Sequence, residues 1–177
     1  MGGYLPTYLK EKLLKRGLNE FEVDSWYRHC PSWDCPAFVG FLPQYLELRT
    51  DRNPKVLSYG DKPFRPLAVN KHSDVVVLVE DAISAIKVAR SGYAAMPLFG
   101  SKLGDYGGLR SVTIVWLDPD KTKEAFNLVD SLRSLGYTAD VIPEFKQDPK
   151  DYSDSEIMNK LETVVSMQHV RNTLTKA

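Results

Sequence analysis

The stretch Val75-Val76-Val77-Leu78-Val79-Glu80-Asp81 decides the fold together with a later one, Val112-Thr113-Ile114-Val115-Trp116-Leu117-Asp118-Pro119-Asp120. Both begin with a continuous apolar run, as in strands buried on both faces of a parallel sheet, and both end in carboxylates. The segment 82–90 between them has helical spacing. This order predicts an α/β unit in which a mostly parallel sheet is flanked by helices. Because ligands bind at the carboxyl ends of such strands, Glu80, Asp118 and Asp120 are candidate site residues.

The two aspartates of the second stretch are candidates for metal binding. Side chains alternate along an extended chain, and Pro119 favours an extended Asp118, so Asp118 and Asp120 should point the same way. Carboxylates that face one space repel each other unless a cation neutralises them, and hard oxygen ligands favour Mg²⁺ or Mn²⁺. The alternative is solvated turn residues or helix caps, with Asp120 capping a helix that starts near Lys121. A further acidic element at 148–151 favours the metal site.

Composition places the chain among ordinary globular proteins. Hydrophobic residues make up 43% of the sequence and charged residues 26%, and the formal net charge is zero. Any nucleic-acid footprint must therefore be a local basic patch. No run is long enough to cross a membrane, and the start of the chain lacks the regions of a signal peptide, so we expect a cytoplasmic protein with no membrane partner.

Cys30 and Cys35 are the two cysteines of the sequence. With His29 they would form half of a zinc site, but a closed structural site needs four ligands, usually with closer spacing. His72 and His169 show no pattern that links them to this pair. We expect reduced thiols in a core or a loop, and no zinc.

Residues 1–70 are predicted to form a small α+β subdomain. The segment 4–27 indicates a helical hairpin that breaks at Gly17, with Asn19 as the N-cap of its second helix. Strands are expected at 38–42, 45–49 and 56–59. Residues 71–177 are predicted to form the α/β domain, with a strand that runs into a loop at Gly100, a helix at 121–135, a strand at 138–142 and a closing helix after a capping box at Ser153.

These features resemble a known family. An apolar strand ending in Glu, a helix, and an apolar strand ending in Asp-x-Asp are similar to the Toprim domain shared by topoisomerases, bacterial-type primases and some nucleases. The resemblance implies that Glu80, Asp118 and Asp120 are catalytic and hold Mg²⁺ or Mn²⁺ for phosphoryl transfer. In primases a Lys-Asp-Pro-x-Asp/Glu segment follows the last strand, and its first Asp faces the metal, which implies Asp148 as a further ligand.

The chain departs from the commonest primase pattern just after Glu80. That pattern has Gly after the Glu and an Asp four residues beyond it, whereas this sequence has Asp81 and Ser84 at those places. Because a serine supplies no negative charge, a second metal would be held more weakly or through Asp81. Schemes with one metal and with two metals both stay open.

The first part also resembles primases. Tyr8-Leu9, then Lys15-Arg16-Gly17-Leu18, a short acidic helix and Phe41-Leu42-Pro43 are similar to the N-terminal subdomain of the primase catalytic core. The resemblance implies template and nucleotide contacts from Arg49, Arg52 and Lys55; the alternative is an ordinary solvated hairpin edge. It also implies that the loop of Gly100 and Ser101 borders the nucleotide, with backbone amides free for phosphates, and that Lys121 neutralises phosphate charge.

The function implied by the resemblance is that of a DNA primase, a nucleotidyltransferase that makes short RNA primers on single-stranded DNA from ribonucleoside triphosphates. The zinc ribbon, helicase domain and helical bundle of complete primases are missing, so we expect a minimal, phage-like enzyme in a host cytoplasm that relies on a helicase or a separate zinc-binding replisome protein. One alternative is a Toprim nuclease, in which water attacks a phosphodiester. Another is a non-catalytic replisome-binding module, a reading that Ser84 favours.

Overall fold

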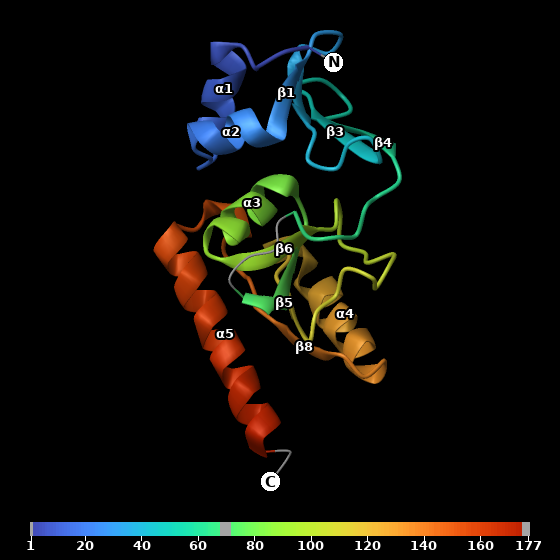
Figure 1. Cartoon of the computed structure of the whole chain (residues 1–177), viewed down its shortest axis with the longest axis vertical. Coiled ribbons are helices and arrows are strands. Elements are labelled where there is room, and N and C mark those ends of the chain that lie inside the picture. The colour runs from blue at the N-terminus through green and yellow to red at the C-terminus, as the bar shows by residue number, and fades with distance from the viewer. Residues whose placement is uncertain (1, 68–71, 175–177) are drawn as a thin grey trace. The chain divides into compact units, whose positions relative to one another are not determined.

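The computed structural model describes residues 2–67 and 72–174. The chain divides into two compact units, Met1–Pro63 and Phe64–Ala177 (Figure 1). The boundary expected from the sequence, between residues 70 and 71, lies outside the described residues. Phe64 and Leu67 already belong to the second unit, because both pack on its cores and the Leu67 N–H donates to the Ala95 carbonyl at 2.8 Å.

The first unit has an α+β fold. Two helices precede a four-stranded antiparallel sheet with the strand order β1-β2-β3-β4. The elements are α1 (Thr7–Leu14), α2 (Glu20–Trp26), β1 (Tyr27–Cys30), β2 (Cys35–Phe38), β3 (Tyr45–Arg49) and β4 (Val56–Gly60). The predicted helical hairpin is confirmed, with Gly17 at a φ of 89° where α1 ends. Asn19 and Glu22 form a capping box at the start of α2, since each side chain accepts a hydrogen bond from the other residue's N–H, at 2.9 and 2.8 Å.

Replacing Asn19 with Ala should destabilise the first unit. The Glu22 N–H would lose its acceptor, which costs about 1 kcal/mol of the free energy of unfolding. Urea denaturation followed by circular dichroism measures this difference. Asn127→Ala, at an exposed position inside a helix, is the control and should change stability little. Equal stability of Asn19→Ala and the wild type would contradict the capping role.

The predicted strand at 38–42 is wrong. β2 ends at Phe38, and the following residues turn, with the Leu42 N–H donating to the Val39 carbonyl at 3.2 Å. The apolar run serves an aromatic cluster, because the Phe38 ring packs against those of Trp26, Tyr27 and Phe41. β1 was missed because it follows α2 without a break.

The second unit is a parallel sheet flanked by helices, which confirms the α/β prediction. The strand order is β6-β5-β7-β8, and all three strand pairs are parallel. The elements are β5 (His72–Val79), α3 (Ala82–Arg90), β6 (Tyr93–Pro97), β7 (Val112–Val115), η1 (Pro119–Lys121), α4 (Thr122–Ser134), β8 (Thr138–Val141), η2 (Pro149–Asp151) and α5 (Asp154–Leu174). Ser153 and Glu156 form the predicted capping box before α5, with the Ser153 N–H donating to Glu156 at 2.8 Å.

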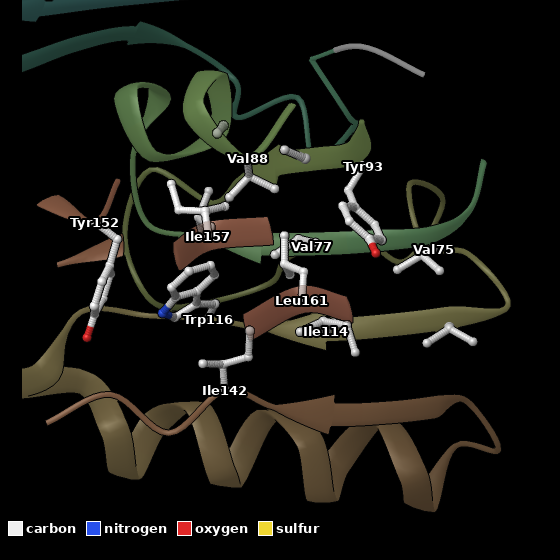
Figure 2. Close-up of a cluster of buried hydrophobic side chains, with 14 residues drawn as sticks. Val75, Val77, Val88, Tyr93, Ile114, Trp116, Ile142, Tyr152, Ile157 and Leu161 are labelled. Carbon is white, nitrogen blue, oxygen red and sulfur yellow. The ribbon is translucent and has the colours of Figure 1, made fainter. Parts of the chain in front are cut away.

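The two faces of this sheet carry separate cores because the side chains of β5 alternate. Val75, Val77 and Val79 join a cluster with residues of α3 and α5, whereas Val76 and Leu78 join a cluster with residues of α4. Figure 2 shows Trp116 in the first cluster, between Tyr152 and the α5 side chains Ile157 and Leu161. The continuous apolar run of β5 is thus the signature of a strand covered on both faces. Within the described residues, no helix has the length and apolar character needed to cross a bilayer.

Candidate active site

The site lies at the carboxyl edge of the parallel sheet. β5 and β7 are neighbours, with Leu78 in register with Val115, and the Trp116 N–H donates to the Leu78 carbonyl at 2.9 Å. Glu80 follows β5 and Asp118 follows β7, so both emerge at this edge. Their carboxyl groups lie in hydrogen-bonding contact. Parallel register therefore brings together two residues that are distant in sequence.

Burial and mutual repulsion dominate the electrostatics of this pair. Burial raises the pKa of Glu80 to about 8, and the charges of Asp118 and Asp120 add to the increase. Burial also raises the pKa of Asp118 to about 6, against the lowering effect of Lys150. Asp118 Oδ1 is buried, and no hydrogen-bond donor in the described part of the chain reaches it. A carboxylate oxygen without a donor, beside a second carboxyl group, is suited to a cation.

Asp120 has a different environment from Asp118, contrary to the expectation that both point the same way. Asp118 is extended, with φ −64° and ψ 158°, but the 3-10 helix η1 begins at Pro119 and ends the alternation. The Asp118 side chain is 17% exposed and that of Asp120 73%. Asp120 pairs with Lys121 at 3.2 Å and adds its charge to the field at Glu80. The N-cap position of α4 belongs to Lys121, so the helix-cap alternative for Asp120 is wrong.

Asp81 is buried and already has two partners. Its carboxylate caps α3 by accepting the Ser84 N–H at 2.8 Å, and it also pairs with Lys150 Nζ at 3.0 Å. The Ser84 hydroxyl is buried, with no hydrogen-bond partner among the described residues. Asp81 therefore serves the start of a helix as well as the acidic cluster.

Lys150 lies among the acidic side chains, a position that no sequence pattern had predicted for it. Its Nζ is 2.6 Å from Asp148, 3.0 Å from Asp81 and 3.7 Å from Asp118. Burial opposes the charged form, but the charge of Asp81 and the hydrogen bond to Asp148 outweigh it and raise the pKa of Lys150 above its usual value. The sequence does contain a hint of this contact, because Lys150 lies two residues after Asp148, a candidate metal ligand. Its reach to Asp81 and Asp118 depends on the fold.

Lys87 holds the backbone that carries Lys150. Lys87 is buried in α3, and its Nζ donates to the carbonyls of Lys150 at 2.6 Å and of Tyr152 at 2.7 Å. A charged donor on two carbonyls forms strong hydrogen bonds, so η2 is fastened to α3. Nothing in the sequence around Lys87 indicates this contact, which joins residues far apart along the chain.

The donor set at this edge fits a hard divalent cation. Glu80, Asp118 and Asp120 offer carboxylate oxygens, as Mg²⁺ and Mn²⁺ prefer, and the buried Asp118 Oδ1 has no other partner among the described residues. As the side chains stand, no three or more His, Cys, Asp or Glu residues within 2–67 and 72–174 converge into a metal cage. Lys150 instead engages Asp81, Asp148 and Asp118 Oδ2.

The loop after β6 runs beside Glu80 but does not offer the expected free amide. The Gly100 N–H donates to the Glu80 carbonyl at 3.2 Å, and the Leu98 N–H donates to the Val79 carbonyl at 2.8 Å. The Gly100 amide itself is therefore not free for phosphates, because it bonds to the backbone. That other amides of this loop approach phosphates stays a prediction. Ser101 follows in the same loop and is partly buried.

A basic pocket of about 330 Å³ lies in the first unit. Arg49 and Lys55 line it together with Lys12 of α1 and with Arg16 in the turn that follows α1. Asp34 and Asp51 also line it, and Asp51 pairs with Lys12. Arg49 is steadied by Glu47, whose buried carboxylate accepts its Nε–H at 2.9 Å. Lys12 lies in α1 and Arg16 in the turn after it, so no helical spacing in the sequence linked these two residues to the pocket.

Arg52, the third basic residue predicted with Arg49 and Lys55, does not line this pocket. It is exposed in the turn between β3 and β4, where its N–H donates to Thr50 Oγ1 at 3.1 Å.

The two cysteines are free thiols and lie opposite each other in the β1–β2 ladder. Cys35 is buried in a small hydrophobic cluster, and burial raises its pKa to about 11. The side chains of His72 and His169 lie outside the described residues. The sequence expectation of reduced thiols agrees with this placement.

Comparisons with known proteins identify a likeness of fold. No family model and no curated protein matches the sequence. Among solved structures, the chain is similar to the Aquifex aeolicus primase, in a crystal structure of its zinc-binding and RNA polymerase domains, with a TM-score of 0.67 and 12% identity. The match covers 89% of this chain and 56% of that one, so the chain spans little more than half of the primase structure. The protein therefore has a primase-like fold of mixed α/β type.

Proposed function

We propose that this chain is a Toprim-type primase core, a metal-dependent nucleotidyltransferase that makes short RNA primers on single-stranded DNA. The observation that carries the proposal is the contact between Glu80 and Asp118 at the carboxyl edge of a parallel sheet, within a fold like that of a primase. Enzymes of the α/β class place ligands at this edge. Two half-buried carboxyl groups with raised pKa values are typical of a functional site.

The residues of the edge would divide the work as follows. Glu80 and Asp118 would hold one Mg²⁺ or Mn²⁺, with Asp120 reaching it from the exposed side. The ion would neutralise the triphosphate and lower the pKa of the attacking 3′-hydroxyl. The new bond joins the 3′-oxygen to the α-phosphorus, and the bond to the β-phosphate breaks to release pyrophosphate. Lys121, beside Asp120, would balance phosphate charge.

Template and nucleotide phosphates would meet the basic residues of the first unit. Arg49, Lys55, Lys12 and Arg16 line one pocket, and Arg52 lies exposed in the adjacent turn. Because the net charge of the chain is zero, this local patch would supply the electrostatic attraction, and binding should weaken steeply with salt. A helicase or a separate zinc-binding replisome protein is the protein partner that we propose.

A primer-synthesis assay tests the proposal. Purified protein is mixed with single-stranded DNA, labelled ribonucleotides and Mg²⁺ or Mn²⁺, and short labelled RNA is expected. Asp120→Asn should reduce the yield about 100-fold or more, because metal-bound charge is worth several kcal/mol in the transition state. Asp130→Asn, at an exposed position of α4, is the matched control and should behave like the wild type.

Two other outcomes would contradict the proposal. Metal-dependent shortening of the DNA without RNA product would make the chain a nuclease that uses the same carboxylates. Absence of both reactions, with DNA or partner binding intact, would make it a binding module.

A further inference from the structure

The acidic cluster has two halves that share Asp118. On one side, Asp118 Oδ2 faces Lys150 Nζ at 3.7 Å, together with Asp81 and Asp148 at 3.0 and 2.6 Å. On the other side, Asp118 Oδ1 has no donor among the described residues, and Glu80 contacts the same carboxyl group. One half therefore already holds an ammonium among its three carboxylates. In the other half Lys121 pairs with the exposed Asp120 at 3.2 Å, and Asp118 Oδ1 keeps no donor among the described residues.

We propose that the Lys150 ammonium takes the place of one divalent ion, so that the site binds a single metal ion, on the side of Glu80, Asp118 Oδ1 and Asp120. This inference rests on the proposed function, since the single ion is the one that would serve nucleotidyl transfer. It decides between the one-metal and two-metal schemes in favour of the first.

The distances exclude a divalent ion and the Lys150 ammonium from lying together among Asp81, Asp148 and Asp118 Oδ2. A divalent ion held by Asp81, Asp148 and Asp118 Oδ2 would stand about 2.0–2.6 Å from those oxygens. Lys150 Nζ already stands 2.6 and 3.0 Å from two of the same oxygens, so the ion and the ammonium would overlap. Ser84, next to Asp81 through its N–H, adds no charge that would favour a second ion.

Lys150 is also fastened in place. Lys87 Nζ binds the carbonyls of Lys150 and Tyr152, which fixes the backbone on both sides of Asp151. Asp81 is held in turn by the start of α3. The Lys150 side chain is 15% exposed, so solvent competes little for its ammonium. These contacts hold the Lys150 ammonium within the cluster.

Counting bound Mn²⁺ tests the inference directly. Electron paramagnetic resonance of free Mn²⁺ during a titration gives the number of ions bound per chain. The wild type should bind one, Lys150→Ala should bind two because the vacated half keeps three carboxylates, and Lys150→Arg should bind one. Lys160→Ala is the matched control, since Lys160 also pairs with a buried carboxylate, Glu144 at 3.7 Å, but outside the cluster; it should bind one.

Two bound ions in the wild type, no bound ion, or a single ion in Lys150→Ala would each overturn the inference. Thermal melting shows whether the variant is folded. The melting temperature of Lys150→Ala should be lower than that of the wild type in EDTA and should rise again with Mn²⁺. If Lys150→Ala does not fold, Lys150→Gln, which keeps polar contact without the charge, takes its place with the same expected count. A wild type that makes primers with two ions refutes this inference alone, whereas one ion without primers refutes the proposed function alone.

Discussion

Glu80→Gln should lose primer synthesis and yet stabilise the metal-free protein. The amide cannot replace a carboxylate as a charged metal ligand, so we expect synthesis to fall about 100-fold or more. The same change removes one of two half-buried carboxyl groups that contact each other and whose pKa values are raised to about 8 and about 6. Because partial exposure screens the repulsion, we expect a gain of about 1–2 kcal/mol in the free energy of unfolding in EDTA at alkaline pH.

The pH dependence has a definite sign. The pKa of Glu80 is higher in the folded protein than in the unfolded chain, so the folded state favours the protonated form. Its contribution to stability is present below the unfolded pKa and is lost as the pH rises through about 8. Urea denaturation in EDTA should therefore show that the free energy of unfolding falls more between pH 6 and pH 9 for the wild type than for Glu80→Gln.

Glu144→Gln is the matched control because this buried glutamate is shifted the other way. Burial favours its neutral form, but the Tyr152 hydroxyl and the N–H groups of Lys146 and Phe145 outweigh burial and lower its pKa. Glu144→Gln should destabilise the protein at neutral pH, and this loss should disappear as the carboxylate is protonated in acid. If Glu80→Gln keeps wild-type synthesis, or is less stable than the wild type at pH 9, the account of the site is wrong.

Trp116→Ala should destabilise the second unit by about 3–5 kcal/mol, as truncation of a buried aromatic side chain usually does. Trp116 follows β7 directly in the sequence and is fully buried. Its ring lies 5.9 Å from that of Tyr152 (Figure 2). The substitution would leave a cavity in the cluster that also holds Ile157 and Leu161 of α5. Chemical denaturation followed by circular dichroism measures the difference.

Trp116→Phe separates packing from polarity. The indole N–H is buried, with no hydrogen-bond partner in the described residues, so removing it sacrifices no such bond. We expect a loss of about 1 kcal/mol, well below that of Trp116→Ala. Phe126→Ala removes an aromatic side chain at a position 44% exposed on α4. It should cost less stability than Trp116→Ala or Trp116→Phe. Equal effects of Trp116→Ala and Phe126→Ala would show that this core does not hold the unit together.

The local prediction of the first unit succeeded where short-range chemistry decides and failed where packing decides. The capping box at Asn19 and the glycine at 17 act within one helical turn, so their sequence signals were sufficient. The segment 39–42 has the apolar composition of a strand, but its aromatic side chain at Phe41 packs on Phe38, and the chain turns instead. Composition alone does not distinguish these two outcomes.

The sequence by itself determined the parallel sheet and the edge at which Glu80 and Asp118 meet, because continuous apolar strands followed by acidic residues leave few alternatives. Only the tertiary structure decided how the other groups fill that edge. Asp120 was turned toward solvent by η1, the Gly100 amide was taken by the Glu80 carbonyl, and Lys150 was placed among three carboxylates from three loops. These contacts join residues far apart in sequence, and their energies depend on distance and burial, which no local pattern specifies.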